Sequence, residues 1–234
     1  MKIGKSYHAG KNYAVVFAIG RNFLASEALC VYNVVYLSSR GVCRGREFEL
    51  KFRADPEKIA AIREKFGAFT PISMETTYYD TPDLKLAFHQ WTLRRRMENG
   101  VSLCTFKRPR EDGSRGEWEV EAPSIMEGVM DLCRQGADWE LMRATAGGLI
   151  EVCGARFTRL AATLEVSGAV VELALDQGVL TGRGKELPLA EVEVELKAGS
   201  DEAAVAFARQ LADEFGLTEE PRSKFVRAMA LAMA

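Results

Sequence analysis

The sequence has few of the side chains that most metal and nucleophilic sites use. It contains two histidines, His8 and His89, and five cysteines without CxxC spacing. A histidine-rich metal site is therefore excluded, and the cysteines argue against a zinc site and against a disulfide framework. Any bound metal must take mainly carboxylate oxygens and water, which favours Mg²⁺ or Mn²⁺.

An excess of positive charge is also missing. The chain carries 31 Lys and Arg against 33 Asp and Glu, a net charge of −2. Proteins that bind nucleic acid through bulk attraction to phosphates are usually basic. We therefore expect no nucleic-acid partner, and an anion would need locally concentrated cations.

Long uninterrupted apolar runs are absent as well. The apolar stretch over residues 13–37 is broken by polar and charged residues, among them Arg21 and Glu27. A membrane span needs about 20 consecutive apolar residues, and a signal peptide needs a clear cleavage site. We expect a cytoplasmic protein with no membrane partner.

The chain divides into two parts by its patterning. Residues 1–44 show little periodicity, and we interpret them as an N-terminal extension that is poorly ordered or a spurious start of the reading frame. Sharp patterning begins at Arg46. We expect one folded domain over residues 45–234, a length that suits a single domain.

Alternation of charged and apolar residues predicts most of the strands. Residues 46–53, 115–121 and 189–198 alternate with the period of a strand, and Asn99-Gly100 predicts a hairpin. We expect strands at 46–53, 73–80, 91–97, 101–108, 115–121, 157–166, 169–176, 178–182 and 189–198, and helices at 56–67, 124–149, 201–215 and 222–233. These elements predict an α+β fold, a closed antiparallel β-barrel with helices packed on the outside.

The charged strand faces can point in two directions. Side chains alternate along a strand, so Glu47, Glu49 and Lys51 share one face and the apolar residues between them share the other. In most sheets the apolar face points inward and the charges meet solvent. We favour the opposite arrangement, with the charges lining a lumen, because amphipathic helices need an apolar surface to cover. In addition, acids and cations segregate by strand, whereas solvent-exposed faces usually mix both signs.

A lumen with acidic and basic walls suits a short polyphosphate. Triphosphate is densely anionic, and Arg and Lys bind its oxygens. It also binds divalent metal ions, which need carboxylate ligands. Catalysis then rests on positioning, electrostatics and a metal-activated water.

Six sequence blocks in order resemble the CYTH family, also called the triphosphate tunnel metalloenzymes. The blocks are Glu47-Phe48-Glu49-Leu50-Lys51, which is the ExExK signature, Tyr78-Tyr79-Asp80-Thr81-Pro82-Asp83, Leu93-Arg94-Arg95-Arg96, Phe106-Lys107, Leu175-Asp176-Gln177-Gly178 and Glu191-Val192-Glu193-Val194-Glu195-Leu196. Ser223-Lys224 completes the set, and the resemblance covers about residues 46–233. The run over residues 171–197 is most similar to the bacterial inorganic triphosphatase branch. We expect this chain to lack the helical CHAD domain that members of that branch often carry.

The resemblance implies roles for the matching residues. It implies metal binding by Glu47, Glu49, Asp176, Glu191, Glu193 and Glu195, and phosphate binding by Lys51, Arg94, Arg96, Lys107, Arg159 and Lys224. It implies catalytic roles for Lys51 and Asp176. The choice among Glu191, Glu193 and Glu195 stays open, and Arg156 competes with Arg159.

The resemblance implies hydrolysis of inorganic triphosphate to pyrophosphate and phosphate, with Mg²⁺ or Mn²⁺. Thiamine triphosphate or nucleoside triphosphate hydrolysis and adenylate cyclisation occur on the same scaffold, and Trp91, Trp118 and Tyr79 could contact an organic substrate. A non-catalytic polyphosphate-binding module is the alternative from another class. Carboxylates in the site disfavour it, because they repel the ligand unless a metal intervenes. The oligomeric state stays open.

Overall fold

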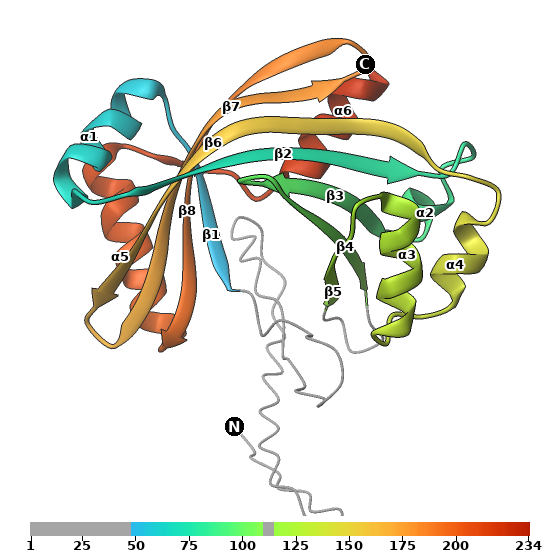
Figure 1. The fold of residues 1–234 in the computed structure, drawn as a ribbon. Helices are drawn as coiled ribbons and strands as arrows, with labels where there is room; N and C mark the ends of the chain where they lie inside the picture. The colour runs from blue at the N-terminus through green and yellow to red at the C-terminus, as the bar shows by residue number, and fades with distance from the viewer. Residues whose placement is uncertain (1–47, 110–114) are drawn as a thin grey trace, which may run out of the picture.

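The computed structural model describes residues 48–109 and 115–234 (Figure 1). The expected N-terminal extension, residues 1–44, and the expected metal ligand Glu47 lie outside these ranges. Within them, none of the helices has the length and hydropathy that a membrane span requires.

Nine strands form one antiparallel sheet, which confirms the expected α+β class (Figure 1). The strands are β1 (Glu49–Arg53), β2 (Thr70–Asp80), β3 (Thr92–Glu98), β4 (Val101–Pro109), β5 (Arg115–Glu121), β6 (Ile150–Val166), β7 (Ala169–Gly182), β8 (Lys185–Gly199) and β9 (Thr218–Glu219). Their order is β5-β4-β3-β2-β6-β7-β8-β1-β9. In the described part of the chain β5 and β9 are the two ends of this order, so the observed pairing does not include the expected closure into a barrel.

β9 was not expected, and among the expected strands β6 and β7 differ most from the sequence prediction. We expected a break in the strand near Gln177, but β7 runs without interruption because both neighbours pair with it there. Gln177 lies opposite Thr158 of β6 and Ala190 of β8. β6 begins earlier than expected, since its first residues pair with the end of β2, as in the pair Ile150 and Asp80.

Six helices complete the described fold: α1 (Pro56–Phe66), α2 (Lys85–Phe88), α3 (Ile125–Arg134), α4 (Glu140–Thr145), α5 (Asp201–Phe215) and α6 (Lys224–Met233). The single helix expected over residues 124–149 is two helices, separated at Gly136, which has φ 99°. α1 begins where the sequence indicates, because the Asp55 side chain accepts a hydrogen bond from the Lys58 backbone N–H at 2.8 Å and Pro56 follows it.

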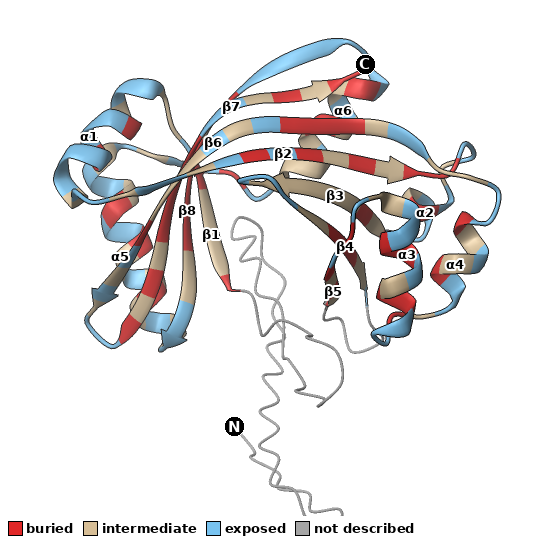
Figure 2. Ribbon diagram, viewed as in Figure 1, coloured by how far each residue is buried: buried red, intermediate tan, exposed pale blue. Residues whose placement is uncertain are grey.

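The apolar strand faces are covered by helices at both ends of the sheet (Figures 1 and 2). At one end α1 and α5 pack on β1, β7 and β8, with Phe52, Leu173 and Val192 buried between them. At the other end α3 and α4 cover β3 to β5, around Phe106 and Leu132. The charged faces therefore point away from these helices, which is the orientation that we favoured from the sequence.

Helix α6 is the exception to the expected placement of helices on the outside. It packs against Ala155, Leu180 and Leu189, which lie on the same sheet face as the charged residues. The part of the charged sheet face that carries these three residues is apolar, and α6 shields it from solvent. A side chain at Gly182 would place its Cβ 2.7 Å from the backbone nitrogen of Ala232, and only glycine allows the helix this close.

Candidate functional site

A cavity of about 490 Å³ lies against the charged face of the sheet. Every described strand except β7 contributes to its wall, as does the first turn of α6. Glu49 and Lys51 of β1 line it together with Glu117 of β5, although these strands stand near opposite ends of the strand order. The sheet thus curls around one common space.

Most of the expected site residues line this cavity, namely Glu49, Lys51, Arg94, Arg96, Lys107, Arg159, Glu193, Glu195 and Lys224. Strand register brings the acids of β1 and β8 together, since Lys51 lies opposite Glu193 and Glu49 lies opposite Glu195. Asp176 and Glu191 are fully buried and are not among the residues that line the cavity.

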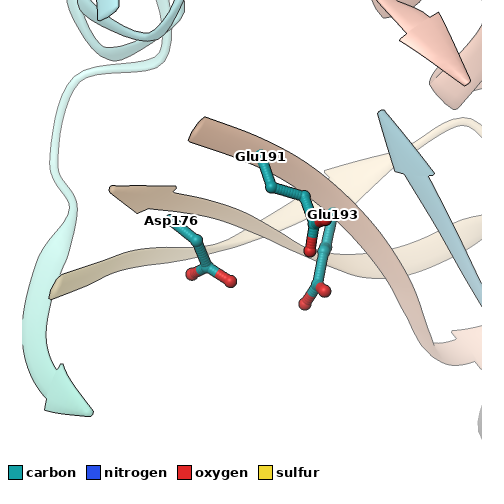
Figure 3. Close-up of side chains that lie close together, drawn as sticks. All are labelled: Asp176, Glu191 and Glu193. Carbon is teal, nitrogen blue, oxygen red and sulfur yellow. The ribbon is translucent and has the colours of Figure 1, made fainter. Parts of the chain in front are cut away.

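Three buried carboxylates form an acidic cluster, which we define as Asp176, Glu191 and Glu193. One oxygen of each lies within 4.8 Å of the others, and the three side chains converge from β7 and β8 (Figure 3). Asp176 and Glu191 are opposite one another in the register of these strands. Oxygen ligands at this spacing suit a hard divalent cation such as Mg²⁺ or Mn²⁺.

Three cations neutralise the acidic cluster. Arg159 donates its Nε and Nη2 hydrogens to the two oxygens of Asp176, each at 2.8 Å, and also donates to Glu193. The Lys224 ammonium lies 2.8 Å from Asp176 and 2.7 Å from Glu193, and it also donates to Glu191.

The third cation is Arg227, which donates to the other oxygen of Glu191. Three carboxylates and three cations thus balance in a buried space, where unpaired charge would be costly.

Burial and charge shift the pKa values in opposite directions within the cluster. Burial raises the pKa of Glu191 to about 7, against the lowering effect of Lys224. Burial acts in the same direction on Glu193, but Lys224 and Arg159 hold its pKa well below the usual range. Burial would lower the pKa of Lys224, but the nearby carboxylates, Glu193 above all, raise it.

The opposite wall of the cavity carries more cations. Arg94 donates to the Thr105 hydroxyl at 3.3 Å, and the Lys107 ammonium lies 3.0 Å from Glu117. Arg96 lies 2.9 Å from Glu98. Burial and the neighbouring Arg94 charge lower the pKa of Arg96. An anion in the cavity would therefore stabilise the charged form of Arg96.

Strand β1, which carries part of the ExExK signature, adds one ion pair to the cavity. The Lys51 ammonium lies 2.8 Å from Glu49 on the same strand face. Burial would lower the pKa of Lys51, but the charges of Glu49 and Glu193 raise it, so this lysine stays positively charged. Glu195 lies opposite Glu49 and 2.8 Å from Lys197, an exposed lysine.

The structure separates the residues that the sequence left in competition. Arg159 lines the cavity, whereas the side chain of Arg156 is exposed and pairs with Glu186. Arg95 lies on the other sheet face, where it donates to the Ser102 hydroxyl at 2.8 Å.

The sequence reasoning missed two charged groups near the site, Arg227 and Glu220. Arg227 stands three residues after Lys224, the spacing of one helix face, so this signal was available. Glu220 is buried where β9 leads into α6, and it binds Arg53 and Arg222. No pattern in the sequence singles out Glu220.

Comparisons with known proteins agree with this architecture. The family profile of the CYTH domain matches residues 45–229. The inorganic triphosphatase of Haemophilus influenzae is 25% identical over 193 residues, which cover 80% of this chain and 55% of that protein. The chain therefore spans about half the length of this relative.

Two solved structures share the fold. The PH1819 protein from Pyrococcus horikoshii OT3 has a TM-score of 0.53 and 24% identity, over 80% of this chain and 99% of that chain. A Hippeastrum protein with a dominant triphosphatase activity has a TM-score of 0.55 and 21% identity, over 77% of this chain and 93% of that chain. At these identities the likeness shows the fold alone. The match of the family profile over most of the chain goes further, and it shows that this chain belongs to the CYTH family.

Proposed function

We propose that this chain hydrolyses inorganic triphosphate to pyrophosphate and phosphate with the help of Mg²⁺ or Mn²⁺. One observation carries the proposal: a single cavity is lined by cations from several strands and meets a cluster of three buried carboxylates at its wall. The name of the Haemophilus influenzae relative, inorganic triphosphatase, supports the same substrate.

The cations would bind the phosphate oxygens. Arg94 and Arg96 stand side by side on one face of β3 and present guanidinium groups, which bind phosphate through paired hydrogen bonds. Lys51, Lys107 and Lys224 would act as point charges around the same anion. Their charge would stabilise the negative charge on the transferring phosphoryl group and on the leaving pyrophosphate.

The acidic cluster would hold the metal ion, with Glu49 and Glu195 contributing from the strand pair beside it. Such an ion, when bound, polarises phosphoryl oxygens and lowers the pKa of a coordinated water. Lys224 and Arg159 now neutralise these carboxylates, so they must turn away to make room for it. Phosphate oxygens in the cavity would offer both cations a new partner. Substrate and metal would therefore bind cooperatively.

The aromatic residues favour an inorganic substrate over an organic one. Trp91 and Trp118 are buried in the core beneath α3, and Tyr79 packs against the same core. None of the three lines the cavity. Tyr78, Phe157 and Phe225 do line it. The Tyr78 and Phe225 rings pack against each other, with 4.9 Å between their centroids, and the Lys224 ammonium lies 5.3 Å from the centroid of the Phe157 ring. A thiamine or nucleoside group would thus find little open aromatic surface.

The carboxylates argue against a binding module without catalysis. Glu49, Glu193 and Glu195 line the cavity beside the cations. They would repel a polyphosphate unless a metal ion lay between them, so they serve a metal-dependent reaction better than simple anion capture.

A phosphate-release assay tests the proposal. The purified protein would be given triphosphate, pyrophosphate, ATP or thiamine triphosphate, with Mg²⁺, Mn²⁺ or a chelator. We expect turnover of triphosphate above the other substrates, and none after the metal is removed. Glu193→Gln and Arg94→Ala should each lower kcat/KM by about a hundredfold or more, as for the loss of a group that stabilises charge in the transition state.

Glu214→Gln is the matched control, because Glu214 lies near the end of α5, does not line the cavity and forms an exposed ion pair with Lys65. Faster turnover of ATP than of triphosphate would favour the nucleotide alternative. Tight binding of triphosphate without any turnover would favour the binding module. Hydrolysis that survives thorough metal removal would refute the metal-dependent mechanism.

A further inference from the structure

Arg227 is a largely buried cation in α6, three residues after Lys224. Its side chain is 10% exposed, and it is not among the residues that line the cavity. Its Nη2 group donates to Glu191, and its Nε is buried without a hydrogen-bond partner among the described residues. A buried guanidinium with an unsatisfied nitrogen costs free energy. Its ion pair with Glu191 is what offsets that cost.

The two oxygens of Glu191 are divided between two cations of α6. Lys224 donates to Oε1 and Arg227 donates to Oε2. The two cations stand three residues apart, which places them on the same face of the helix. Glu191 is therefore held from both sides by one element.

The two cations differ in what else they can reach. Lys224 lies within ion-pair distance of all three acids of the cluster and also lines the cavity. Phosphate in the cavity can therefore compete for Lys224. Arg227 has no such access, so it would stay with Glu191 when Lys224 turns to phosphate.

We propose that Arg227 is a positioning residue, which keeps the Glu191 carboxylate aimed into the acidic cluster so that the cluster can bind a divalent metal while Lys224 binds phosphate. This inference rests on the function proposed above. Arg227 itself touches neither metal nor substrate. It acts by holding a metal ligand in place through the hydrogen bond to Glu191. Loss of such a contact typically weakens metal binding about tenfold to a hundredfold.

Manganese binding tests this role without relying on turnover. The signal of free Mn²⁺ in electron paramagnetic resonance would give the Kd for Mn²⁺ of the full chain and of its variants. We expect Arg227→Met to raise the Kd about tenfold or more, and Arg227→Lys to raise it less because the charge remains. Arg134→Met is the control, since Arg134 pairs with Asp131 on an exposed part of α3.

A double-mutant cycle shows whether Arg227 acts through Glu191. In the Glu191→Gln background, Arg227→Met should change the Kd for Mn²⁺ by less than about twofold, because the carboxylate that it positions is gone. This double variant also removes both charges of the pair, so it should fold even if Arg227→Met alone does not. The KM for triphosphate at saturating Mn²⁺ should change little, because Arg227 does not contact phosphate.

The outcomes separate this inference from the proposed function. A folded Arg227→Met variant that binds Mn²⁺ as tightly as the wild type, or more tightly, would overturn the positioning role, as would an equal loss of affinity in both backgrounds. The proposed function would survive either result if the wild type hydrolyses triphosphate. The wild type could instead bind Mn²⁺ and hydrolyse nothing, while the double-mutant cycle gives the expected coupling between Arg227 and Glu191. The positioning role would then stand and the proposed reaction would fail.

Discussion

The Lys224 ammonium and the Glu193 carboxylate lie 2.7 Å apart, although they are separated by 31 residues in the chain. Lys224 is the first residue of α6, and Glu193 lies in β8. The pair therefore ties α6, which lies on the cavity face, to the acidic cluster. Binding of metal or phosphate at this point acts on both partners, and the position of α6 and the charge of the cluster depend on each other.

Removal of the Lys224 charge should lower the free energy of unfolding and increase the stabilisation of the fold by a bound metal ion. Lys224→Met leaves all three acids of the cluster with fewer cations, and breaking a buried ion pair costs about 3–5 kcal/mol. We expect the free energy of unfolding to fall by about this amount without metal. Mn²⁺ should raise the Tm more in this variant than in the wild type, because the ion replaces the missing charge.

Chemical denaturation and thermal unfolding, each with and without Mn²⁺, check this expectation. Lys65→Met serves as the control, since Lys65 pairs with Glu214 at the surface and such a pair contributes about 1 kcal/mol or less. Equal effects of Mn²⁺ on the Tm of Lys224→Met and of the wild type would contradict the argument.

Arg94 and Arg95 offer a matched comparison of the two sheet faces. Arg94 lines the cavity, whereas Arg95 lies on the other face beside Ser102. We expect Arg94→Lys to lower kcat/KM for triphosphate about tenfold or more, because lysine cannot form the paired hydrogen bonds of a guanidinium. Arg95→Lys should stay within about threefold of the wild type. Steady-state kinetics of both variants would show an inverted order if the faces were assigned wrongly.

Metal binding should depend on pH through Glu191. Burial raises the pKa of this carboxyl to about 7, so it is largely protonated at pH 6 and largely ionised at pH 8. A proton and a metal ion compete for the same carboxylate, and the affinity for Mn²⁺ should rise about tenfold between pH 6 and pH 8. Titration of Mn²⁺ across this range measures the effect. A Glu191→Gln variant should bind more weakly, with a flatter dependence on pH; an unchanged slope would show that another group titrates.

Glu220 should stabilise the fold at neutral pH and lose this effect in acid. Its hydrogen bonds with Arg222, and then with Arg53, lower its pKa from 4.5 to about 2. Because the folded pKa lies below the unfolded one, the stabilisation is present above about pH 4.5 and is lost as the pH falls toward 2. The partner arginines are about half exposed, which weakens the interaction.

We expect Glu220→Gln to lower the free energy of unfolding by about 2 kcal/mol at pH 7, less than the pKa shift alone would give. The difference from the wild type should shrink between pH 4.5 and pH 2.5 in urea denaturation. Glu214→Gln, at an exposed pair, should change little at any pH. A constant difference for Glu220→Gln across this range would show that packing is the cause instead of charge.

Local patterns in the sequence determined most of the elements and most of the cavity wall. Strict alternation in residues 46–53 and 189–198 marks strands whose charged residues share a face, and this period depends only on backbone geometry. Asn99-Gly100 joins β3 and β4, because both residues take positive φ values of 50° and 88°. Asp55-Pro56 marks the start of α1, since it supplies a cap acceptor and a residue with a preset φ.

Only the tertiary structure decided which strands, helices and ion-pair partners contact these strand faces. The continuity of β7 depends on hydrogen bonds from β6 and β8, which no local signal contains. α6 lies on the cavity face because apolar residues of three strands meet there, at Ala155, Leu180 and Leu189. The pairing of Arg227 with Glu191 follows from that placement. Charge alternation is a property of one strand, but the neutralisation of a buried charge depends on every element packed around it, so its partners emerge only from the folded chain.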